Sequence, residues 1–334
     1  NDDLISFFER RGLATVLERG GRYFPESGKA LDVVHTLNNW LLENRVELKK
    51  EHPVTEIIVK DGAAAGVRTR SKTWYAPKII VATGGVSYPR TGSTGDGFKL
   101  LKKLGHTSTP LRPALVSLTT PQKEVSQLSG LSLRNVSTRL FLNGKRKGIE
   151  FGEVDFTKKR GLAGPSIITL SGTVVDALAK SQKVTLVLDL KPALNEKKLA
   201  NRLLRDFEKR GGEPIGSILR GILPKQLVAF CMDQCELEPT MDTKNFPLKK
   251  RKQLVQWLKN IRFEIDGHGS WDEAIITNGG INLKEINPRT MESRLVSNLY
   301  IAGELLNLQA ATGGYNLQAA FSMGRLAGRS AATG

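Results

Sequence analysis

Three short apolar stretches of the sequence each run into a pair of glycines, at residues 79–85, 274–280 and 299–314. The last stretch places Gly303-Glu304 after the apolar residues and Thr312-Gly-Gly-Tyr-Asn316 before a segment with helical apolar spacing. Glycine lets a backbone approach a ligand closely, and a helix N-terminus offers free N–H groups and the positive end of the helix dipole. This stretch therefore suits an anionic or polar ligand, although a plain strand–loop–helix connection would show the same pattern.

The elements that must position these residues are short strands of an α/β sheet. The β-branched run at 78–82 is typical of a buried parallel strand, and it ends at Thr83-Gly-Gly85. Open α/β folds bind ligands at the carboxyl ends of such strands. Residues 55–59 and 66–69 flank Asp61-Gly62, which predicts a hairpin. Because glycine pairs occur on both sides of the middle of the chain, we predict one α/β sheet interrupted by an insertion.

The middle of the chain has a different character. Residues 136–142 alternate apolar and polar side chains, Asn143-Gly144 is a type I′ hairpin signal, and 149–156 and 183–190 predict further strands. This part is expected to form a small antiparallel barrel or sandwich. Pro165 suits the first turn of a helix. Residues 192–260 show helical spacing of apolar side chains.

A helix of residues 317–328 is predicted from its spacing. The positions that share one stripe are Leu317, Ala320, Phe321, Gly324 and Gly328.

The charge of the chain is its strongest bulk property. The 334 residues carry a formal net charge of +17, which favours a polyanionic partner such as nucleic acid through neutralisation of phosphates. A solvated basic surface without a partner is the alternative, and no known RNA- or DNA-binding motif accompanies the charge. Lys197-Lys198 form one of four basic clusters. The positions in the other three, which we predict to bind nucleic acid, are Lys145, Arg146, Lys147, Lys158, Lys159, Arg160, Lys249, Lys250, Arg251 and Lys252.

Several other classes of protein are disfavoured. No apolar run approaches the roughly 20 residues of a membrane helix, so no membrane partner is expected. Cys231 and Cys235 lie four residues apart in a helical pattern, fit a reducing cytoplasm, and lack neighbouring Cys or His to complete a zinc site. We expect buried, inert thiols, no metal and a cytoplasmic protein. The chain begins at Asn1 in mid-pattern, and we expect that a preceding segment is missing.

The order and spacing of short motifs resemble the YhiN/BaiN family of FAD-dependent oxidoreductases nearly end to end. The matching residues are Gly21-Arg-Tyr-Phe-Pro25 with Lys29 and Asp32-Val33, Ile79-Ile-Val-Ala-Thr-Gly-Gly85, Tyr88-Pro89, Thr91-Gly92, Gly95-Asp-Gly97, Phe156-Thr157, Gly161-Leu-Ala-Gly-Pro165, Glu273-Ala-Ile275, Thr277, Gly279-Gly280, Ile286-Asn-Pro288, Thr290-Met-Glu-Ser293, Tyr300-Ile-Ala-Gly-Glu304 and Thr312-Gly-Gly-Tyr-Asn316.

The resemblance implies a Rossmann-like FAD-binding domain of the two-dinucleotide-binding type, split by an inserted antiparallel β-barrel and a helical subdomain. The expected ranges are 1–110 with 271–334 for FAD binding, 111–191 with 261–270 for the barrel, and 192–260 for the helices. The residues implied to hold FAD are Val54, Thr83, Gly84, Gly85, Gly303, Glu304, Thr312, Gly313, Gly314, Tyr315, Asn316 and Leu317. The family also begins with a strand and a G-x-G-x-x-G helix for the pyrophosphate, which this chain lacks, so we expect the chain alone to bind FAD weakly.

The activity implied by the resemblance is reduction of an electron-poor double bond, with NAD(P)H reducing FAD. The implied substrate is a uridine of large-subunit ribosomal RNA, which becomes dihydrouridine, or a small unsaturated or steroid-like molecule. The charge of +17 favours the RNA. A peroxide-forming amine oxidase and a flavin-free RNA-binding protein on the same fold are the alternatives. No catalytic residue is assigned, and the candidate proton donors are Tyr88, Arg90, Tyr315 and Asn316.

Overall fold

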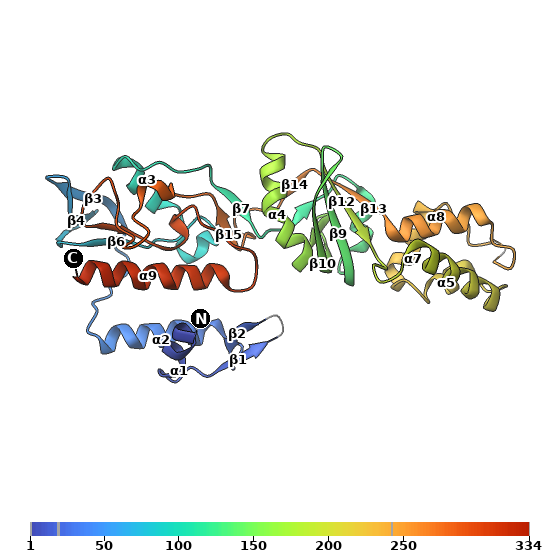
Figure 1. The fold of residues 1–334 in the computed structure, drawn as a ribbon, viewed down its shortest axis with the longest axis horizontal. Coiled ribbons are helices and arrows are strands. Elements are labelled where there is room, and N and C mark those ends of the chain that lie inside the picture. The colour runs from blue at the N-terminus through green and yellow to red at the C-terminus, as the bar shows by residue number, and fades with distance from the viewer. Residues whose placement is uncertain (1, 19–20, 242, 334) are drawn as a thin grey trace. The chain divides into compact units, whose positions relative to one another are not determined.

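The chain divides into two units in the computed structural model, which describes residues 2–18, 21–241 and 243–333 (Figure 1). One unit contains Asn1–Arg112 and Ile276–Gly334, and the other contains Pro113–Ile275. The first unit is therefore discontinuous in sequence, and the second is inserted into it. The expected division of the insertion into a barrel and a helical subdomain remains a prediction.

A parallel pair of strands lies at the centre of the first unit. Strand β6 (Ile79–Val81) pairs with β16 (Leu299–Ile301), with Ile79 opposite Leu299, although 220 residues separate these two positions. All three residues of β16 are buried, as the apolar run predicts. Helix α9 (Tyr315–Thr333) contributes Ala327, Met323 and Leu326 to the same core.

The helix predicted at 317–328 is thus confirmed, but the stripe identified from the sequence is only partly covered: Phe321 packs edge-on against Phe8, and none of the five positions is fully buried. Leu317 is 66% exposed, and a methyl group added at Gly324 would meet no atom within 4 Å. The side that packs is centred on Ala327 instead. Alanine and glycine carry little hydrophobic signal, so they left the orientation of the helix undetermined.

Other strands of the first unit form a small antiparallel sheet and a separate hairpin. The sheet has the order β3 (Val54–Lys60), β4 (Ala63–Thr69) and β5 (Thr73–Tyr75). Asp61 and Gly62 both have positive φ, +49° and +76°, which confirms the predicted hairpin turn. The other elements are α1 (Asp2–Glu9), β1 (Thr15–Glu18), β2 (Arg22–Pro25), α2 (Ala30–Glu43), η1 (Pro89–Thr91), α3 (Asp96–Lys103), β15 (Ile276–Asn278), η3 (Leu283–Glu285) and η4 (Gly303–Leu305).

The second unit is built on a seven-stranded antiparallel sheet with the order β13-β12-β9-β10-β11-β8-β14. The strands are β8 (Leu118–Thr119), β9 (Ser132–Leu142), β10 (Lys145–Thr157), β11 (Gly161–Ala163), β12 (Val184–Asp189), β13 (Ile261–Ile265) and β14 (Gly267–His268), and β7 (Arg112–Ala114) and η2 (Lys123–Leu128) complete the non-helical part. Asn143 and Gly144 between β9 and β10 have φ of +48° and +78°, as expected for the type I′ turn.

The closed barrel expected in this unit is not seen. The consecutive strands β13 and β14 lie at opposite edges of the sheet, and within the described residues they pair with β12 and β8 but not with each other. The alternating pattern predicts strands and their buried faces, but closure depends on how the two edges meet.

Helices pack on this sheet and share its core. They are α4 (Pro165–Leu178), α5 (Glu196–Lys209), α6 (Ile215–Leu219), α7 (Lys225–Gln234) and α8 (Leu248–Lys259). Leu140 of the sheet and Leu199 and Leu254 of the helices belong to one continuous hydrophobic cluster. Cys231 and Cys235 are fully buried in it. The thiol of Cys231 hydrogen-bonds to Cys235, which raises the pKa of Cys231 and lowers the pKa of Cys235.

Candidate functional site

The ends of the three strand-to-glycine stretches meet at the carboxylate of Glu304. Its Oε1 accepts hydrogen bonds from the hydroxyl of Ser87 at 2.9 Å and from the backbone N–H of Thr277 at 2.5 Å. The hydroxyl oxygen of Thr277 accepts in turn from the backbone N–H of Val86 at 2.7 Å. We call Ser87, Thr277 and Glu304 the strand-end node, because they connect the segments that follow β6 and β16 with strand β15.

Several glycines around the node are required by contact between segments of the chain. A methyl group on Gly85 would lie 2.2 Å from the hydroxyl oxygen of Thr277, and one on Gly280 would lie 2.7 Å from the backbone oxygen of Leu305. The backbone at Gly280 runs beside η4, where the N–H of Ile281 donates to the oxygen of Leu305 at 2.8 Å. These glycines allow the strand ends to pack tightly, so they are not themselves evidence of a ligand.

Two other glycines face open space. Gly303 and Gly314 have positive φ of +79° and +87°, and a methyl group added to either would meet no atom within 4 Å. Gly303 precedes Glu304 directly, and Gly314 lies at the N-terminus of α9, where the first N–H groups have no partner within the helix. Backbone that is open beside a carboxylate and a helix N-terminus can accept a polar or anionic ligand at close range.

Two side chains, those of Asn316 and Gln309, hold the loop before α9. The amide of Asn316 accepts from the N–H of Ala310 at 2.9 Å and donates to the oxygen of Ala310 at 2.9 Å. Gln309 donates to the side-chain oxygen of Asn278 at 2.6 Å, which ties the loop to the end of β15. Tyr315, in contrast, is 63% exposed. Asn316 therefore shapes the loop, whereas the ring of Tyr315 is available to a ligand.

The other residues predicted to hold FAD are spread over the same unit. Val54 begins β3 and pairs with Thr69. Thr83 is exposed directly after β6, and Gly84 has a φ of +75°. Thr312 and Gly313 lie in the exposed-to-half-buried loop before α9. The structure thus joins Glu304 to the β6 end through hydrogen bonds, and the contact of these residues with FAD remains a prediction.

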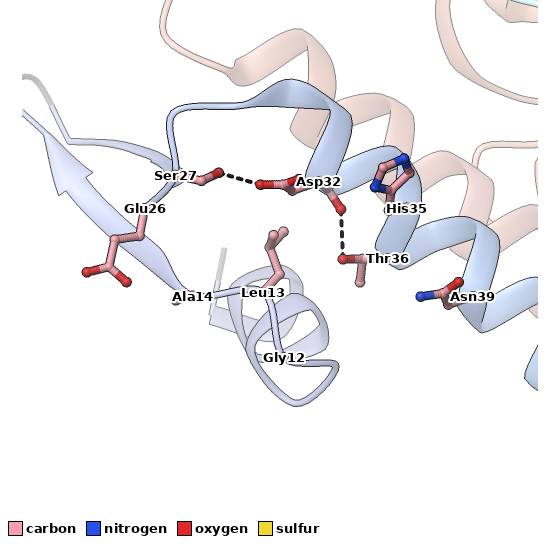
Figure 2. Close-up of a pocket in the computed structure, with 9 residues that line it drawn as sticks. All are labelled: Gly12, Leu13, Ala14, Glu26, Ser27, Asp32, His35, Thr36 and Asn39. Atoms are coloured by element: carbon pink, nitrogen blue, oxygen red, sulfur yellow. Dashed lines mark hydrogen bonds between the residues drawn. The ribbon is translucent and has the colours of Figure 1, made fainter.

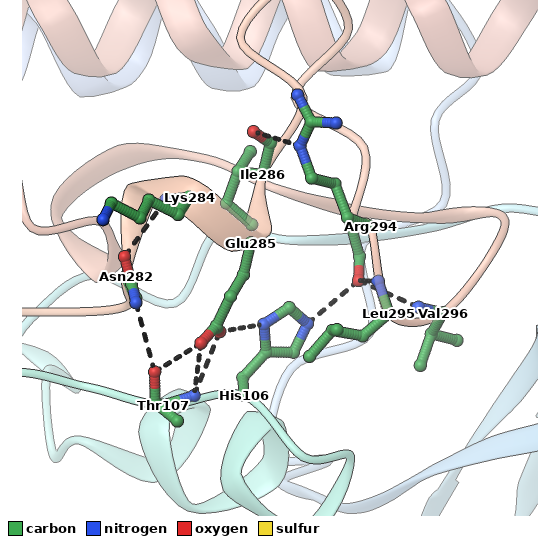
Figure 3. A network of polar contacts seen from close by, with 10 residues as sticks. His106, Thr107, Asn282, Lys284, Glu285, Ile286, Arg294, Leu295 and Val296 are labelled. Carbon is green, nitrogen blue, oxygen red and sulfur yellow. Dashed lines mark hydrogen bonds and ion pairs between the residues drawn. The ribbon is translucent and has the colours of Figure 1, made fainter.

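Sequence reasoning missed Ser87 of the node and a second polar network that supports it (Figure 3). The ring of His106 is fully buried; its Nδ1 lies 2.9 Å from Oε2 of Glu285, and its Nε2 lies 3.0 Å from the hydroxyl of Ser293. The N–H of Thr107 donates to Glu285 at 3.0 Å. His106 and Glu285 are 179 positions apart, and no sequence motif indicates that the two side chains are in contact.

This second network fixes the chain that follows the glycine pair at 279–280. Burial opposes ionisation of Glu285, but the hydrogen bonds from Thr107 and His106 outweigh it and lower the pKa of the carboxyl group. The ionised Glu285 therefore links the segment after α3 to η3. Because Ile281 hydrogen-bonds to η4, order in this segment supports the backbone beside Glu304.

A hollow of about 520 Å³ lies elsewhere in the first unit and does not match the predicted flavin residues (Figure 2). Its lining includes the carboxylates of Glu26 and Asp32, and the Ser27 hydroxyl donates to Asp32 at 2.5 Å. Among the described lining residues there is no lysine or arginine to offset these two carboxylates, which is unfavourable for a diphosphate group. We therefore place no nucleotide there.

Comparison with known proteins identifies the family. Residues 1–330 match the family model of the HI0933-like protein Rossmann domain. The chain belongs to the HI0933-like family. The resemblance inferred from the motifs is confirmed, and membership supports a Rossmann-like domain and an oxidoreductase of the flavoprotein type.

Three curated relatives of this HI0933-like protein carry names with an activity. A 3-dehydro-bile acid delta(4,6)-reductase of Clostridium scindens is 27% identical over 99% of this chain and 80% of its own length. A ribosomal RNA dihydrouridine synthase of Haemophilus influenzae is 30% identical over 96% of this chain and 77% of its own length. A ribosomal RNA dihydrouridine synthase of Escherichia coli K12 is 27% identical over 96% and 76%, respectively.

The basic residues predicted to bind nucleic acid do not form one patch in the HI0933-like chain. Residues 145–147 begin β10 and 158–160 follow its end, so strand residues 148–157, roughly 35 Å, separate the two clusters. On α8, the ammonium of Lys250 donates to the backbone oxygen of Cys235 at 3.0 Å and pairs with Glu236. Lys250 therefore has a structural role, while Lys249 and Lys252 are exposed.

Two absences concern only the described part of the HI0933-like chain. No helix there is long and apolar enough to cross a membrane. No group of three or more His, Cys, Asp or Glu side chains there is arranged to hold a metal ion.

Proposed function

We propose that the protein is an FAD-dependent, NAD(P)H-driven reductase that converts a uridine of large-subunit ribosomal RNA to dihydrouridine. The observation that carries the proposal is the convergence of the segment after β6, strand β15 and the end of β16 on Glu304, with open backbone at the preceding Gly303 and at Gly314 before α9. Membership of the HI0933-like family supports the flavoprotein chemistry.

The residues at the strand-end node fit the polar parts of a flavin dinucleotide. Within the described residues, Oε1 of Glu304 is bound by Ser87 and Thr277, whereas Oε2 has no hydrogen-bond partner. Oε2 is therefore available to the hydroxyl groups of a ribityl chain. The N–H groups at Gly314, Tyr315 and Asn316 lie at the start of α9 and would stabilise negative charge on a neighbouring ring edge.

FAD, once reduced by NAD(P)H, would supply the hydride, and the chain has to supply a proton donor and a position for the substrate. The amide of Asn316 is already used in the bonds to Ala310, which leaves Tyr88, Arg90 and Tyr315 among the candidates. Tyr88 follows Ser87 of the node, is 46% exposed, and has a φ of +52°. Such a backbone conformation is costly for a tyrosine and is concentrated at functional sites, so we favour Tyr88.

The ribosomal RNA substrate is favoured by charge. A net charge of +17 suits a polyanion and is not needed by a small neutral molecule. Two relatives, at 30% and 27% identity, are named ribosomal RNA dihydrouridine synthases. A base has to leave its stack to present its double bond, and this is easiest in a loop or single strand.

A second candidate is reduction of a conjugated double bond in a small molecule. It is favoured by the relative named 3-dehydro-bile acid delta(4,6)-reductase, which matches 99% of this chain. The chemistry is the same hydride transfer, so the substrate alone distinguishes the two proposals.

The test is a map of dihydrouridine in large-subunit ribosomal RNA from cells that lack the gene. We expect one dihydrouridine to disappear and to return with the wild-type gene, but not with Glu304→Gln. Glu208→Gln, an exposed position of α5 outside the node and outside the predicted RNA-binding residues, is the matched control. A map that does not change on deletion would exclude the RNA substrate and leave the small-molecule reductase. If the protein cannot be reconstituted with FAD, both candidates fail and a flavin-free RNA-binding protein remains.

A further inference from the structure

An exposed apolar pair lies on strand β10 of the second unit. Ile149 is 57% exposed and Phe151 is 64% exposed. Alternate residues of a strand point to the same face and lie about 6.6 Å apart, so the two side chains stand next to each other. Adjacent exposed apolar side chains, unlike single scattered ones, can mark a site of interaction.

The opposite face of β10 is already used by the core. A methyl group on Gly148 would lie 3.0 Å from Leu170 of α4, and one on Gly152 would lie 3.7 Å from Ser166 of α4. Figure 1 shows α4 beside β9 and β10. Ile149 and Phe151 alternate with these glycines, so they project away from α4. Their neighbours across the sheet are Arg139 and Ser137 on β9.

Three cations begin the same strand. Lys145, Arg146 and Lys147 are all exposed, and in the part of the chain that the structure describes none of them forms an ion pair. By contrast, Lys259 of α8 forms an ion pair with Asp189 at 2.5 Å. The cations at the start of β10 thus have no ion-pair partner among the described residues, and Phe151 follows Lys147 by four strand residues, roughly 13 Å.

We propose that the face of β10 that carries Ile149 and Phe151, together with the exposed cations Lys145, Arg146 and Lys147 at the start of the strand, binds single-stranded RNA. The ring of Phe151 stacks on an unpaired base, Ile149 packs against the neighbouring base or sugar, and the three cations contact phosphates. A duplex cannot offer its base faces to Phe151, so the surface selects unpaired RNA. The inference rests on the proposed function for the source of the RNA and adds the surface that holds it.

The three cations could instead protect a free strand edge from self-association. The experiment below distinguishes this role from RNA binding. Among the described strands, residues 145–152 of β10 pair only with β9, which leaves a free strand edge. Lysine and arginine at such an edge prevent two copies from pairing through it. Under that alternative, removal of the charges causes self-association and leaves RNA affinity unchanged.

The binding experiment uses a fluorescent 12-nucleotide oligouridylate and an RNA duplex of equal length, without nicotinamide cofactor. We expect the wild-type protein to prefer the single strand. Phe151→Ala should weaken binding of the single strand roughly 5- to 150-fold, the range for loss of one stacked base. Phe151→Trp should restore it. Tyr75→Ala removes a 68% exposed aromatic ring from β5, beside Lys60, and should leave the affinity unchanged.

The salt dependence tests the cations. Replacement of Lys145, Arg146 and Lys147 by Gln should reduce the slope of log affinity against log salt by up to about 2, at roughly 0.7 per phosphate contact. Equal binding by wild type and Phe151→Ala, an effect of Tyr75→Ala as large as that of Phe151→Ala, or no binding by wild type would overturn the inference. So would dimerisation of the triple variant, seen by size-exclusion chromatography with light scattering, at unchanged RNA affinity.

The outcome is independent of catalysis. If Phe151→Ala binds RNA normally while the protein still forms dihydrouridine in cells, the surface is refuted and the proposed function stands. If binding depends on Phe151 but deletion of the gene changes no ribosomal dihydrouridine, the proposed substrate is refuted and the surface stands.

Discussion

Three glycine-to-alanine substitutions in the first unit should change the free energy of unfolding by different amounts, because the space around the three glycines differs. At Gly280 a methyl group would lie 2.7 Å from the oxygen of Leu305 and 2.8 Å from the nitrogen of Asn307, and φ is +144°. All of these neighbours are backbone atoms, which cannot move aside as a flexible side chain would. At Gly314 and Gly324, a methyl group would meet no atom within 4 Å.

The expected magnitudes follow from these environments. Gly280→Ala combines about 1–3 kcal/mol of backbone strain with about 1–3 kcal/mol of overpacking, so we expect a loss of about 2–6 kcal/mol. Gly314→Ala has a φ of +87° but no clash, so only about 1–2 kcal/mol should be lost. Gly324 lies inside α9, where alanine is the better helix former by about 1 kcal/mol, and this variant should be more stable than wild type.

The affinity for FAD should follow a different order from the stability. Gly314→Ala places its methyl group on the open face beside the helix N-terminus, so we expect at least about tenfold weaker FAD binding with most of the stability retained. Gly324→Ala should bind FAD as the wild type does. Because Gly280 shapes the backbone beside Glu304, Gly280→Ala should lose FAD affinity only together with the local fold.

Urea unfolding measures stability, with Trp40 and Trp74 as the fluorophores of the first unit and separate transitions allowed for the two units. Hydrogen exchange of peptides from residues 276–308 then localises the damage in Gly280→Ala. The reasoning fails if Gly280→Ala unfolds within 1 kcal/mol of wild type. The assignment of Gly314 to the ligand face fails if its alanine variant binds FAD as tightly as wild type.

Three further substitutions test individual polar contacts. Glu285→Gln should cost about 2–3 kcal/mol at pH 7, from the loss of charge-assisted hydrogen bonds. Because the pKa of Glu285 is lowered, the difference from wild type should shrink as the pH falls through that lowered pKa, which urea unfolding at a series of decreasing pH values measures. Lys259→Met leaves the largely buried carboxylate of Asp189 without its ion-pair partner and should lower the free energy of unfolding by about 3–5 kcal/mol. Urea unfolding followed by Trp257 fluorescence measures this loss, and most of it should be recovered when Asp189→Leu is added. Arg210→Met should raise the pKa of Glu213 from about 2 toward its ordinary value, and an NMR titration in which the carboxyl shift is unchanged would contradict the assigned pairing.

Local features of the fold were predictable from the sequence because their causes are local. The turns at Asp61-Gly62 and Asn143-Gly144 need two consecutive positive φ values, which these residue pairs tolerate. Pro165 begins α4 because its fixed φ suits a first helical turn. The apolar runs that become β6 and β16 were also recognisable.

Contacts between distant segments were not predictable from one sequence. Gly85 is required by Thr277, which lies 192 positions later and is not marked by any local pattern. The sequence therefore identified glycines at the right strand ends but could not tell a glycine needed for chain packing from one that faces a ligand. Gly280 and Gly314 look alike as members of Gly-Gly pairs, and only the surrounding atoms distinguish them.

The same limit applies to charge, and it bears on how an RNA surface should be identified. Ten clustered basic residues looked equivalent in the sequence, yet Lys250 donates to Cys235 and Arg160 donates to the backbone oxygen of Pro121 at 3.1 Å. A cation held by the protein's own backbone has fewer free N–H groups for a phosphate. The cations at the start of β10 have no such partner among the described residues, and Phe151 on the same strand adds a ring that can stack on a base. The combination of free charge with an exposed ring, rather than the number of charges, therefore distinguishes this surface from an ordinary solvated one.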